Sequence, residues 1–271
     1  MSSNVSTPDL GPQRTVAPPS PSPLGASPPA TGPMDDIPPL SLEILTETDD
    51  KVDGIWLIAD SIAQQRQFAS LTLVFHPACL AGLAAGLAAA YQFAWVWRHE
   101  LGLTLSMLSA VLMTYLLGIR YVSSAYLKLA EDMNYDWIVG DEGEEDIVLG
   151  ARYGKDIISA LVLRLEPNAS LAGKKKTRSL TLKGGKGVIR GWTTRLRYRK
   201  RGVGSDLLHE AIRITRERCG KDAEIGFAKE HANSVMVLPE YFNRGFRKHE
   251  QQAAKALDKA LGEWDGAKRK K

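Results

Sequence analysis

Residues 192–208 read WTTRLRYRKRGVGSDLL, and this stretch decides how the soluble part of the chain is expected to fold. It starts like a strand, continues as a basic loop containing Gly202 and Gly204, and a helix is predicted to begin immediately afterwards. Glycines let the backbone approach a phosphate closely, while free N–H groups and the dipole at a helix start favour an anion. The stretch therefore predicts an anion-binding cradle. A turn without a ligand, or a basic face against anionic lipid, would have the same composition.

Apolar periodicity on both sides of this stretch predicts an α/β fold, a mixed and partly antiparallel sheet with flanking helices. Strands are expected at residues 40–45, 147–153, 157–165, 188–198 and 223–227. Helices are expected at residues 52–63, 121–132, 205–218, 233–242 and 251–261.

Two apolar runs interrupt this domain. The first run, residues 71–97, has 27 residues and none with a formal charge. The second, residues 101–119, has 19 such residues, and Arg98-His99-Glu100 lies between the two runs. As helices they would be roughly 40 and 28 Å long, enough for a ~30 Å hydrocarbon core. We therefore predict a transmembrane helical hairpin in contact with the lipid bilayer; two buried helices of a soluble bundle are the alternative. Gly82 and Gly86 form a GxxxG pattern, which permits a homodimer through the hairpin.

The charges around the hairpin predict its orientation. Arg66, Arg120 and Lys128 flank the two runs, whereas the connecting turn contains only Arg98 and His99. Since positive residues favour the cytosolic side, the N-terminus and the soluble domain are expected in the cytosol. The C-terminal Lys-Arg-Lys-Lys approximates an endoplasmic-reticulum retrieval signal, and a chance basic tail is the alternative.

The averages of the chain conceal these differences. It has 271 residues with a net charge of +4 and 44% hydrophobic residues, which excludes collagen, a disulfide-stapled miniprotein and a many-pass membrane protein. Of its 14 prolines, 11 lie within residues 1–40. Because such a stretch has too little apolar surface to offset its ordering entropy, we predict a disordered Pro/Ser-rich tail over residues 1–39.

A resemblance to a known family rests on three parts of this sequence. Residues 199–204 (RKRGVG) match the R/Q-x-x-G-x-G/A signature of the GNAT superfamily of acyl-CoA N-acyltransferases, and Leu207-Leu208 follow where its helix packs. Asn233 and then residues 241–246 (YFNRGF) resemble its N…Y-x-x-x-G-F segment. The layout is also similar to membrane-anchored N-acetyltransferases of the endoplasmic reticulum, in which a hydrophobic hairpin follows the first strand and helix.

The resemblance implies an N-acetyltransferase that moves the acetyl group of acetyl-CoA, its cosubstrate, directly to an amine acceptor, without a metal. It implies that Tyr241 protonates the departing thiolate. A base must remove a proton from the amine, and we assign Glu230 to this role, with Glu224 and His231 as alternatives. The residues implied to bind acetyl-CoA are Trp192, Thr193, Thr194, Arg199, Lys200, Arg201, Gly202, Val203, Gly204, Ser205 and Asn233.

Departures from the family pattern keep a second hypothesis open. The Asn233-to-Tyr241 spacing is one residue longer than usual, and the chain after Phe246 becomes helical and charged, so the last strand of the family is expected to be short, displaced or missing. The alternative function is a catalytically inactive adaptor or assembly factor for other membrane proteins. Residues 174–201 contain 12 Lys/Arg and no Asp/Glu, which we assign to CoA phosphates and anionic headgroups rather than to nucleic acid.

These predictions divide the chain into five parts. They are the tail, the first strand and helix, the transmembrane hairpin, the remainder of the acyltransferase-like domain, and a C-terminal helix with its basic tail, at residues 1–39, 40–70, 71–119, 120–250 and 251–271. The acceptor amine cannot be identified from the sequence.

Overall fold

The computed structural model describes residues 39–96, 99–140, 143–167 and 182–269. The chain divides into two units, Met1–Ile37 and Pro38–Lys271, and the described residues all belong to the second. The predicted disordered tail, apart from residue 39, and the last residues of the basic C-terminus therefore lie outside the described residues, as does much of the Lys-rich segment before β4.

A five-stranded mixed sheet forms the centre of the fold, in the order β1-β2-β3-β4-β5. The first four strands are antiparallel neighbours, and β5 pairs in parallel with β4. Their bounds are β1 Leu40–Ile44, β2 Ile147–Tyr153, β3 Asp156–Glu166, β4 Lys186–Thr194 and β5 Ile225–Phe227. The predicted α/β class with a mixed, partly antiparallel sheet is confirmed. The fourth strand ends at Thr194, earlier than predicted, because a 3-10 turn over Leu196–Tyr198 follows it.

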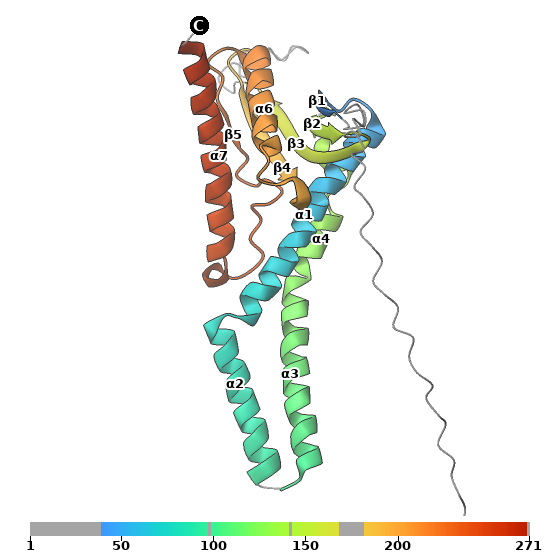
Figure 1. Cartoon of the computed structure of the whole chain (residues 1–271), viewed down its shortest axis with the longest axis vertical. Coiled ribbons are helices and arrows are strands. Elements are labelled where there is room, and N and C mark those ends of the chain that lie inside the picture. The colour runs from blue at the N-terminus through green and yellow to red at the C-terminus, as the bar shows by residue number, and fades with distance from the viewer. Residues whose placement is uncertain (1–38, 97–98, 141–142, 168–181, 270–271) are drawn as a thin grey trace, which may run out of the picture. The chain divides into compact units, whose positions relative to one another are not determined.

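Helices cover both faces of this sheet. Helix α1 (Thr48–Val74) packs on one face through Ile55, Ile58 and Ile62, and α6 (Val203–Cys219) packs on the other through Leu207 and Leu208. The central strand β3 alternates between the two cores, since Ala160 and Val162 face α1 while Leu161 and Leu163 face α6. Helix α7 (Arg244–Arg269) lies alongside α6 (Figure 1).

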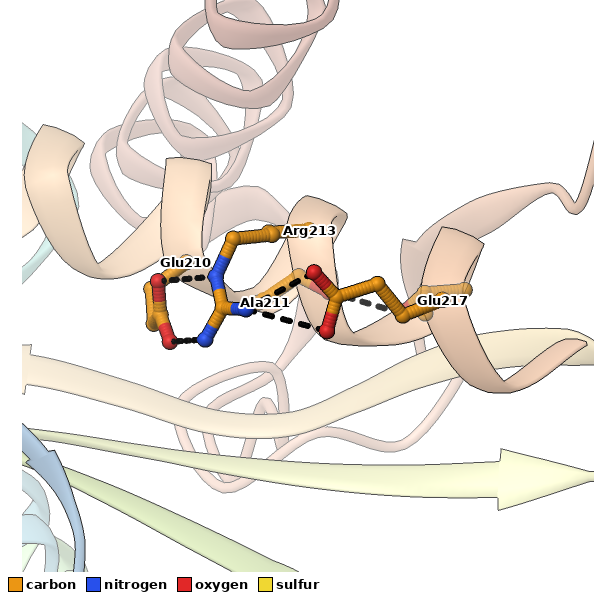
Figure 2. A network of polar contacts seen from close by, with 5 residues as sticks. Glu210, Ala211, Arg213 and Glu217 are labelled. Carbon is orange, nitrogen blue, oxygen red and sulfur yellow. Dashed lines mark hydrogen bonds and ion pairs between the residues drawn. The ribbon is translucent and has the colours of Figure 1, made fainter. Parts of the chain in front are cut away.

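The outer face of α6 is polar, in agreement with its predicted amphipathicity. Arg213 lies between Glu210 and Glu217, one turn away on either side (Figure 2). Its Nε donates to Glu210 (2.9 Å) and its Nη1 to both carboxylate oxygens of Glu217 (2.8 and 2.9 Å). The hydrogen bond from Arg213 lowers the pKa of Glu210. The helix stops at Cys219, and Gly220 follows with φ of 120°.

Helix α1 extends beyond the predicted residues 52–63 and includes the first residues of the first apolar run. It continues to Val74, and a new helix, α2 (Pro77–Tyr91), begins after His76, whose Nδ1 accepts from Ala78 N–H (3.3 Å). The run over 71–97 is therefore not one helix. Proline lacks an N–H and cannot continue α1, but it suits the first position of α2.

The second apolar run forms α3 (Leu101–Ser123), which α4 (Ala125–Glu131) continues after a short break. Helices α2 and α3 lie side by side (Figure 1), and a π-helical turn over Gln92–Val96 ends the first of them. A Cβ added at Gly86 would lie 3.3 Å from Val111 Cγ1, whereas one at Gly82 would meet nothing within 4 Å. Gly86 of the GxxxG pattern therefore allows α2 and α3 to pack closely within the hairpin, whereas Gly82 does not take part in this contact.

The segment after β5 differs most from prediction. The helix expected over 233–242 is wrong, since only the 3-10 turn Glu240–Phe242 forms after Pro239, whose fixed φ and missing N–H oppose a helix interior. Helix α7 is longer than the expected residues 251–261. Within the described residues 228–269 no strand follows β5, so α7 stands where the family pattern has its last strand.

A third hydrophobic cluster joins this segment to the base of the hairpin. Phe242 and Phe246 pack with Leu73, Ile119 and Tyr126, and the rings of Phe246 and Tyr126 stack with centroids 5.6 Å apart. The glycine of the YFNRGF segment is explained here, because a Cβ on it would lie 2.7 Å from Phe68 Cζ. The segment therefore connects the sheet domain with the helical hairpin.

Candidate functional site

A hollow of about 400 Å³ lies where β4 ends and α6 begins. All of the predicted cofactor-binding residues except Arg201 and Val203 line it, together with Tyr198. We call it the cofactor hollow. The structure thus brings Asn233, which is distant in sequence, next to the glycine loop.

The sheet opens at this hollow because β4 and β5 pair only briefly. Their register covers Gly187–Ile189 against β5, while β4 continues to Thr194 and stays paired with β3 throughout. Beyond Ile189, Ala232 N–H reaches Arg190 O (2.7 Å), and no strand pairing with β5 is described for Trp192–Thr194. One edge of these three residues is therefore available for hydrogen bonds to an extended ligand.

The loop that leads into α6 has backbone conformations suited to a close approach. Lys200 and Gly202 have φ of 62° and 92°, in the left-handed region that favours glycine. At Gly204 a Cβ would lie 3.0 Å from Trp192 Cζ2, and Trp192 Nε1 donates to the Gly204 carbonyl (3.1 Å). The indole therefore fixes the first turn of the helix against the strand.

The N–H groups at this helix start match the requirements of an anion. Ser205 and Asp206 N–H donate to the Gly202 carbonyl (2.7 and 3.1 Å), whereas Val203 and Gly204 N–H meet no acceptor among the described residues. Orphan donors at a helix N-terminus, with basic side chains nearby, bind phosphate groups. The residues present therefore fit the diphosphate of a CoA thioester.

Hydrogen bonds hold the end of β4 in place. The buried Ser159 hydroxyl donates to the Thr193 carbonyl (2.6 Å) and lies 2.8 Å from Thr194 Oγ1. Arg199 Nε donates to the Thr194 carbonyl (2.8 Å), which ties the basic loop back onto the strand. Part of the hydrogen-bonding capacity of this strand end is thus used by the protein itself.

Asn233 is positioned by α1, which the sequence did not indicate. Its Oδ1 accepts from Ser61 Oγ (3.2 Å) and Gln65 Nε2 (3.1 Å). With the oxygen occupied in this way, the amide Nδ2 is the part of Asn233 that can donate to a ligand carbonyl. The helical spacing of Ser61 and Gln65 was visible in the sequence, but their partner was not.

A second hollow of about 670 Å³ adjoins the first and shares Trp192, Arg199, Lys200 and Asn233 with it. Its remaining walls come from α1 and α7, with His231 between them. We call it the acceptor-side hollow. Apart from Phe246, the wall on α7 lies after the last motif of the family pattern, so the sequence offered no signal for its other residues, His249, Glu250, Gln252 and Ala253.

His231 lies in this hollow, and its environment favours the neutral imidazole. Burial lowers its pKa, against a smaller opposing effect from the charge of Glu250. Its Nδ1 accepts from Asn233 N–H (3.3 Å), which leaves the proton of the neutral ring on Nε2.

The two predicted catalytic side chains lie elsewhere. The Tyr241 ring is 68% exposed and contacts Phe242 (4.5 Å between centroids) and His76 (6.4 Å), and Glu230 is exposed. Neither lines either hollow. Their catalytic roles stay predictions, and the structure does not bring them together with the predicted cofactor-binding residues. In the described residues no group of three or more His, Cys, Asp or Glu could hold a metal ion.

The site thus combines two parallel strands that pair only briefly with a glycine loop at the start of a helix. Residues 112–246 match the acetyltransferase (GNAT) family. This segment is just under half of the chain and matches a GNAT acetyltransferase domain, a family that in general uses acetyl-CoA and an amine acceptor. Both hollows include residues of the matched segment.

Two solved structures are similar to this chain. A transcriptional regulator from Bacillus halodurans C-125 has 20% identity and a TM-score of 0.27, covering 47% of this chain and 67% of its own. A protein from Pyrococcus horikoshii, described provisionally as an acetyltransferase, has 13% identity and a TM-score of 0.30, covering 78% of this chain and 88% of its own. No curated protein matches the chain.

Proposed function

We propose that this protein is a membrane-anchored N-acetyltransferase that transfers the acetyl group of acetyl-CoA directly to an amine. The observation that supports this most strongly is the cofactor hollow, in which a strand edge open over Trp192–Thr194 meets unpaired N–H groups at the start of α6. Acetyl-CoA supplies the activated acetyl group as a thioester. In this proposal Val203 and Gly204 N–H bind the diphosphate and Asn233 Nδ2 binds the pantetheine arm.

The reaction needs little more than positioning and two proton movements. The nitrogen of a neutral amine attacks the acetyl carbonyl, an amide bond forms, the C–S bond breaks, and the sulfur leaves as a thiolate that takes up a proton. The attacking nitrogen loses a proton to a base. We assign the acid to Tyr241 and the base to Glu230, with His231 as the alternative that lies in the acceptor-side hollow itself.

We further propose that the hairpin spans a bilayer, in the endoplasmic reticulum, with the sheet domain in the cytosol. Two segments, Pro77–Val96 and Leu101–Glu131, are long and apolar enough, and only 11% of the apolar window in each is buried. Leu105, Met113 and Leu117 are more than half exposed along α3. Lipid would cover these side chains. A homodimer through the hairpin would use the open side at Gly82.

A second candidate function, a catalytically inactive adaptor, is favoured by one observation. The tyrosine of the family segment is exposed beside His76 instead of facing the cofactor hollow, and its neighbours Phe242 and Phe246 join the domain to the hairpin. An adaptor would retain this connection without turnover.

Titration calorimetry of acetyl-CoA into the full chain in detergent micelles tests the proposal. We expect wild type to bind and Gly204→Val to lose at least tenfold in affinity, because a side chain there collides with Trp192. Gly262→Val on α7, where an added Cβ meets nothing within 4 Å, is the matched control. Absence of binding in folded wild type would refute the enzyme. Binding without thiol release across an amine panel would select the adaptor.

A further inference from the structure

The wall that α1 gives to the acceptor-side hollow changes from polar to apolar along its length. Ser61, Gln64, Gln65, Phe68 and Leu71 all line the hollow, and their i, i+3, i+4, i+7, i+10 spacing places them on one face of the helix. Of the polar members, Ser61 and Gln65 contact Asn233, which also lines the cofactor hollow. Gln67 lines the hollow as well. The apolar members lie toward the end of α1, where the chain enters the hairpin.

The opposite wall, on α7, has one feature that suits an amine. Phe246, His249, Glu250 and Ala253 line the hollow from one face of the helix, again with i, i+3, i+4, i+7 spacing. Glu250 is the single acidic residue among the lining residues. Glu250 is exposed at the rim, and its carboxylate is the group of this lining that would pair with an ammonium group before the amine loses its proton.

The apolar end of the hollow continues toward the hairpin. Leu71 is 51% exposed, and Phe75, at the end of α1, is 69% exposed. Pro77, two residues later, begins the first apolar segment that could cross a membrane. Leu196, 63% exposed, adds a further apolar side chain to the lining of the hollow. A ligand held here thus has an apolar route from the amine position at Glu250 toward the start of α2.

We propose that the acceptor is a primary amine on a long alkyl chain, which enters from the bilayer surface with its chain along Phe68 and Leu71 and its amine toward Glu250. This inference rests on the proposed function, since it names the acceptor of the same site. A short, water-soluble amine bound at Glu250 would leave the apolar side chains Phe68 and Leu71 without contact. The reaction converts the amine to its N-acetyl amide and releases CoA as the free thiol.

The test compares butylamine, octylamine and dodecylamine as acceptors, with the full chain reconstituted in phosphatidylcholine vesicles and thiol release as the readout. We expect kcat/KM to rise about tenfold or more from butylamine to dodecylamine, because each methylene gains apolar contact. Leu71→Gln should lower the dodecylamine value at least threefold and leave butylamine unchanged. Trp56→Gln, an exposed apolar-to-polar change on α1 outside the hollow, should alter neither value and so controls for non-specific effects of such a change.

The amine end of the site is tested separately. Glu250→Gln should raise the KM of all three amines several-fold, while Asp258→Asn, an exposed acid on α7 outside the hollow, should not. Acetyl-CoA binding by calorimetry should be the same in all four variants. If wild type binds acetyl-CoA but turns over butylamine as well as dodecylamine, or if Leu71→Gln acts like Trp56→Gln, the inference is wrong while the proposed acetyltransferase activity stands. Failure to bind acetyl-CoA removes the proposed function itself.

Discussion

The cofactor hollow and the acceptor-side hollow are neighbours, yet the chain builds them in different ways. The cofactor hollow comes almost entirely from residues 192–205 and uses backbone groups and a small residue at Gly204. The acceptor-side hollow combines side chains of α1 and α7, which are separated by 169 residues in the sequence. Backbone recognition requires a local conformation, whereas side-chain recognition requires the whole fold, so each hollow should respond to a different kind of substitution.

The largest effect is expected at a buried charge cluster that includes Arg190 of β4, the strand that leads to both hollows. Asp146 is buried and pairs with Arg164 (2.7 Å) and Arg190 (2.5 Å), and Arg190 lies over the Trp137 ring (4.3 Å) while its strand continues to Trp192. Asp146→Ala leaves two partly buried guanidinium groups without their partner and should cost about 3 kcal/mol in unfolding free energy.

Chemical unfolding followed by circular dichroism measures this cost. Glu166→Ala, which removes an exposed ion pair with Lys186 (3.0 Å), is the control and should cost less than about 0.5 kcal/mol. Equal losses in the two variants would show that Asp146 does not support the sheet in the way the geometry indicates.

Ser159→Ala should damage the cofactor hollow alone. The substitution removes the donor to the Thr193 carbonyl in a buried position, at a cost of about 1 to 2 kcal/mol. We expect weaker acetyl-CoA binding, measured by calorimetry, and an unchanged ratio of kcat/KM between long and short amines. A changed ratio with unaltered acetyl-CoA affinity would contradict the separation of the two hollows.

Gln65→Ala should show where the hollows are linked. Gln65 holds Asn233, which lines both of them. Losing a hydrogen bond worth about 1 kcal/mol should reduce acetyl-CoA affinity about fivefold and raise amine KM in the same variant. If Gln65→Ala changed the acetyl-CoA affinity or the amine KM but not both, Asn233 would contribute to binding in only one of the hollows.

The pH dependence of thermal stability tests the protonation of His231, which lines the acceptor-side hollow. Burial lowers the pKa of His231, so the unfolded chain, with an ordinary value of about 6.5, binds its proton first as the pH falls. Stability contributed by His231 is therefore present above about pH 6.5 and is lost as the pH drops through the lower folded value. We expect Tm to fall by a few degrees between pH 7.5 and 5.5, and less in His231→Gln. Equal pH dependence in the two proteins would exclude His231 as the cause.

The smallest effect is expected on the outer face of α6. Arg213→Ala removes the ion pairs in Figure 2, but the side chain is 44% exposed and solvent screens the charges. A loss of at most about 0.5 kcal/mol should follow, with both hollows unchanged. A larger loss in thermal unfolding would mean that the network also holds α6 in place.

The difference between the hollows also explains what the sequence could and could not predict. Gly202, Gly204 and the start of α6 were predictable because an anion cradle needs consecutive residues of defined types. The contact of Ser61 and Gln65 with Asn233 was not, since nothing local relates α1 to a residue 168 positions later. The helix expected over 233–242 failed because apolar spacing there serves packing on the hairpin rather than a helical face.

The cluster that joins the hairpin to the domain has a practical consequence for anyone who handles this protein. Leu73, Ile119 and Phe242 are buried together, and Tyr115 Oη on α3 donates to the Val74 carbonyl (2.8 Å). A shortened chain without residues 77–118 would leave one side of this cluster open to water and would tend to aggregate. Purification should therefore start from the intact chain, and insolubility of a trimmed version would say nothing about whether the full-length protein has the proposed activity.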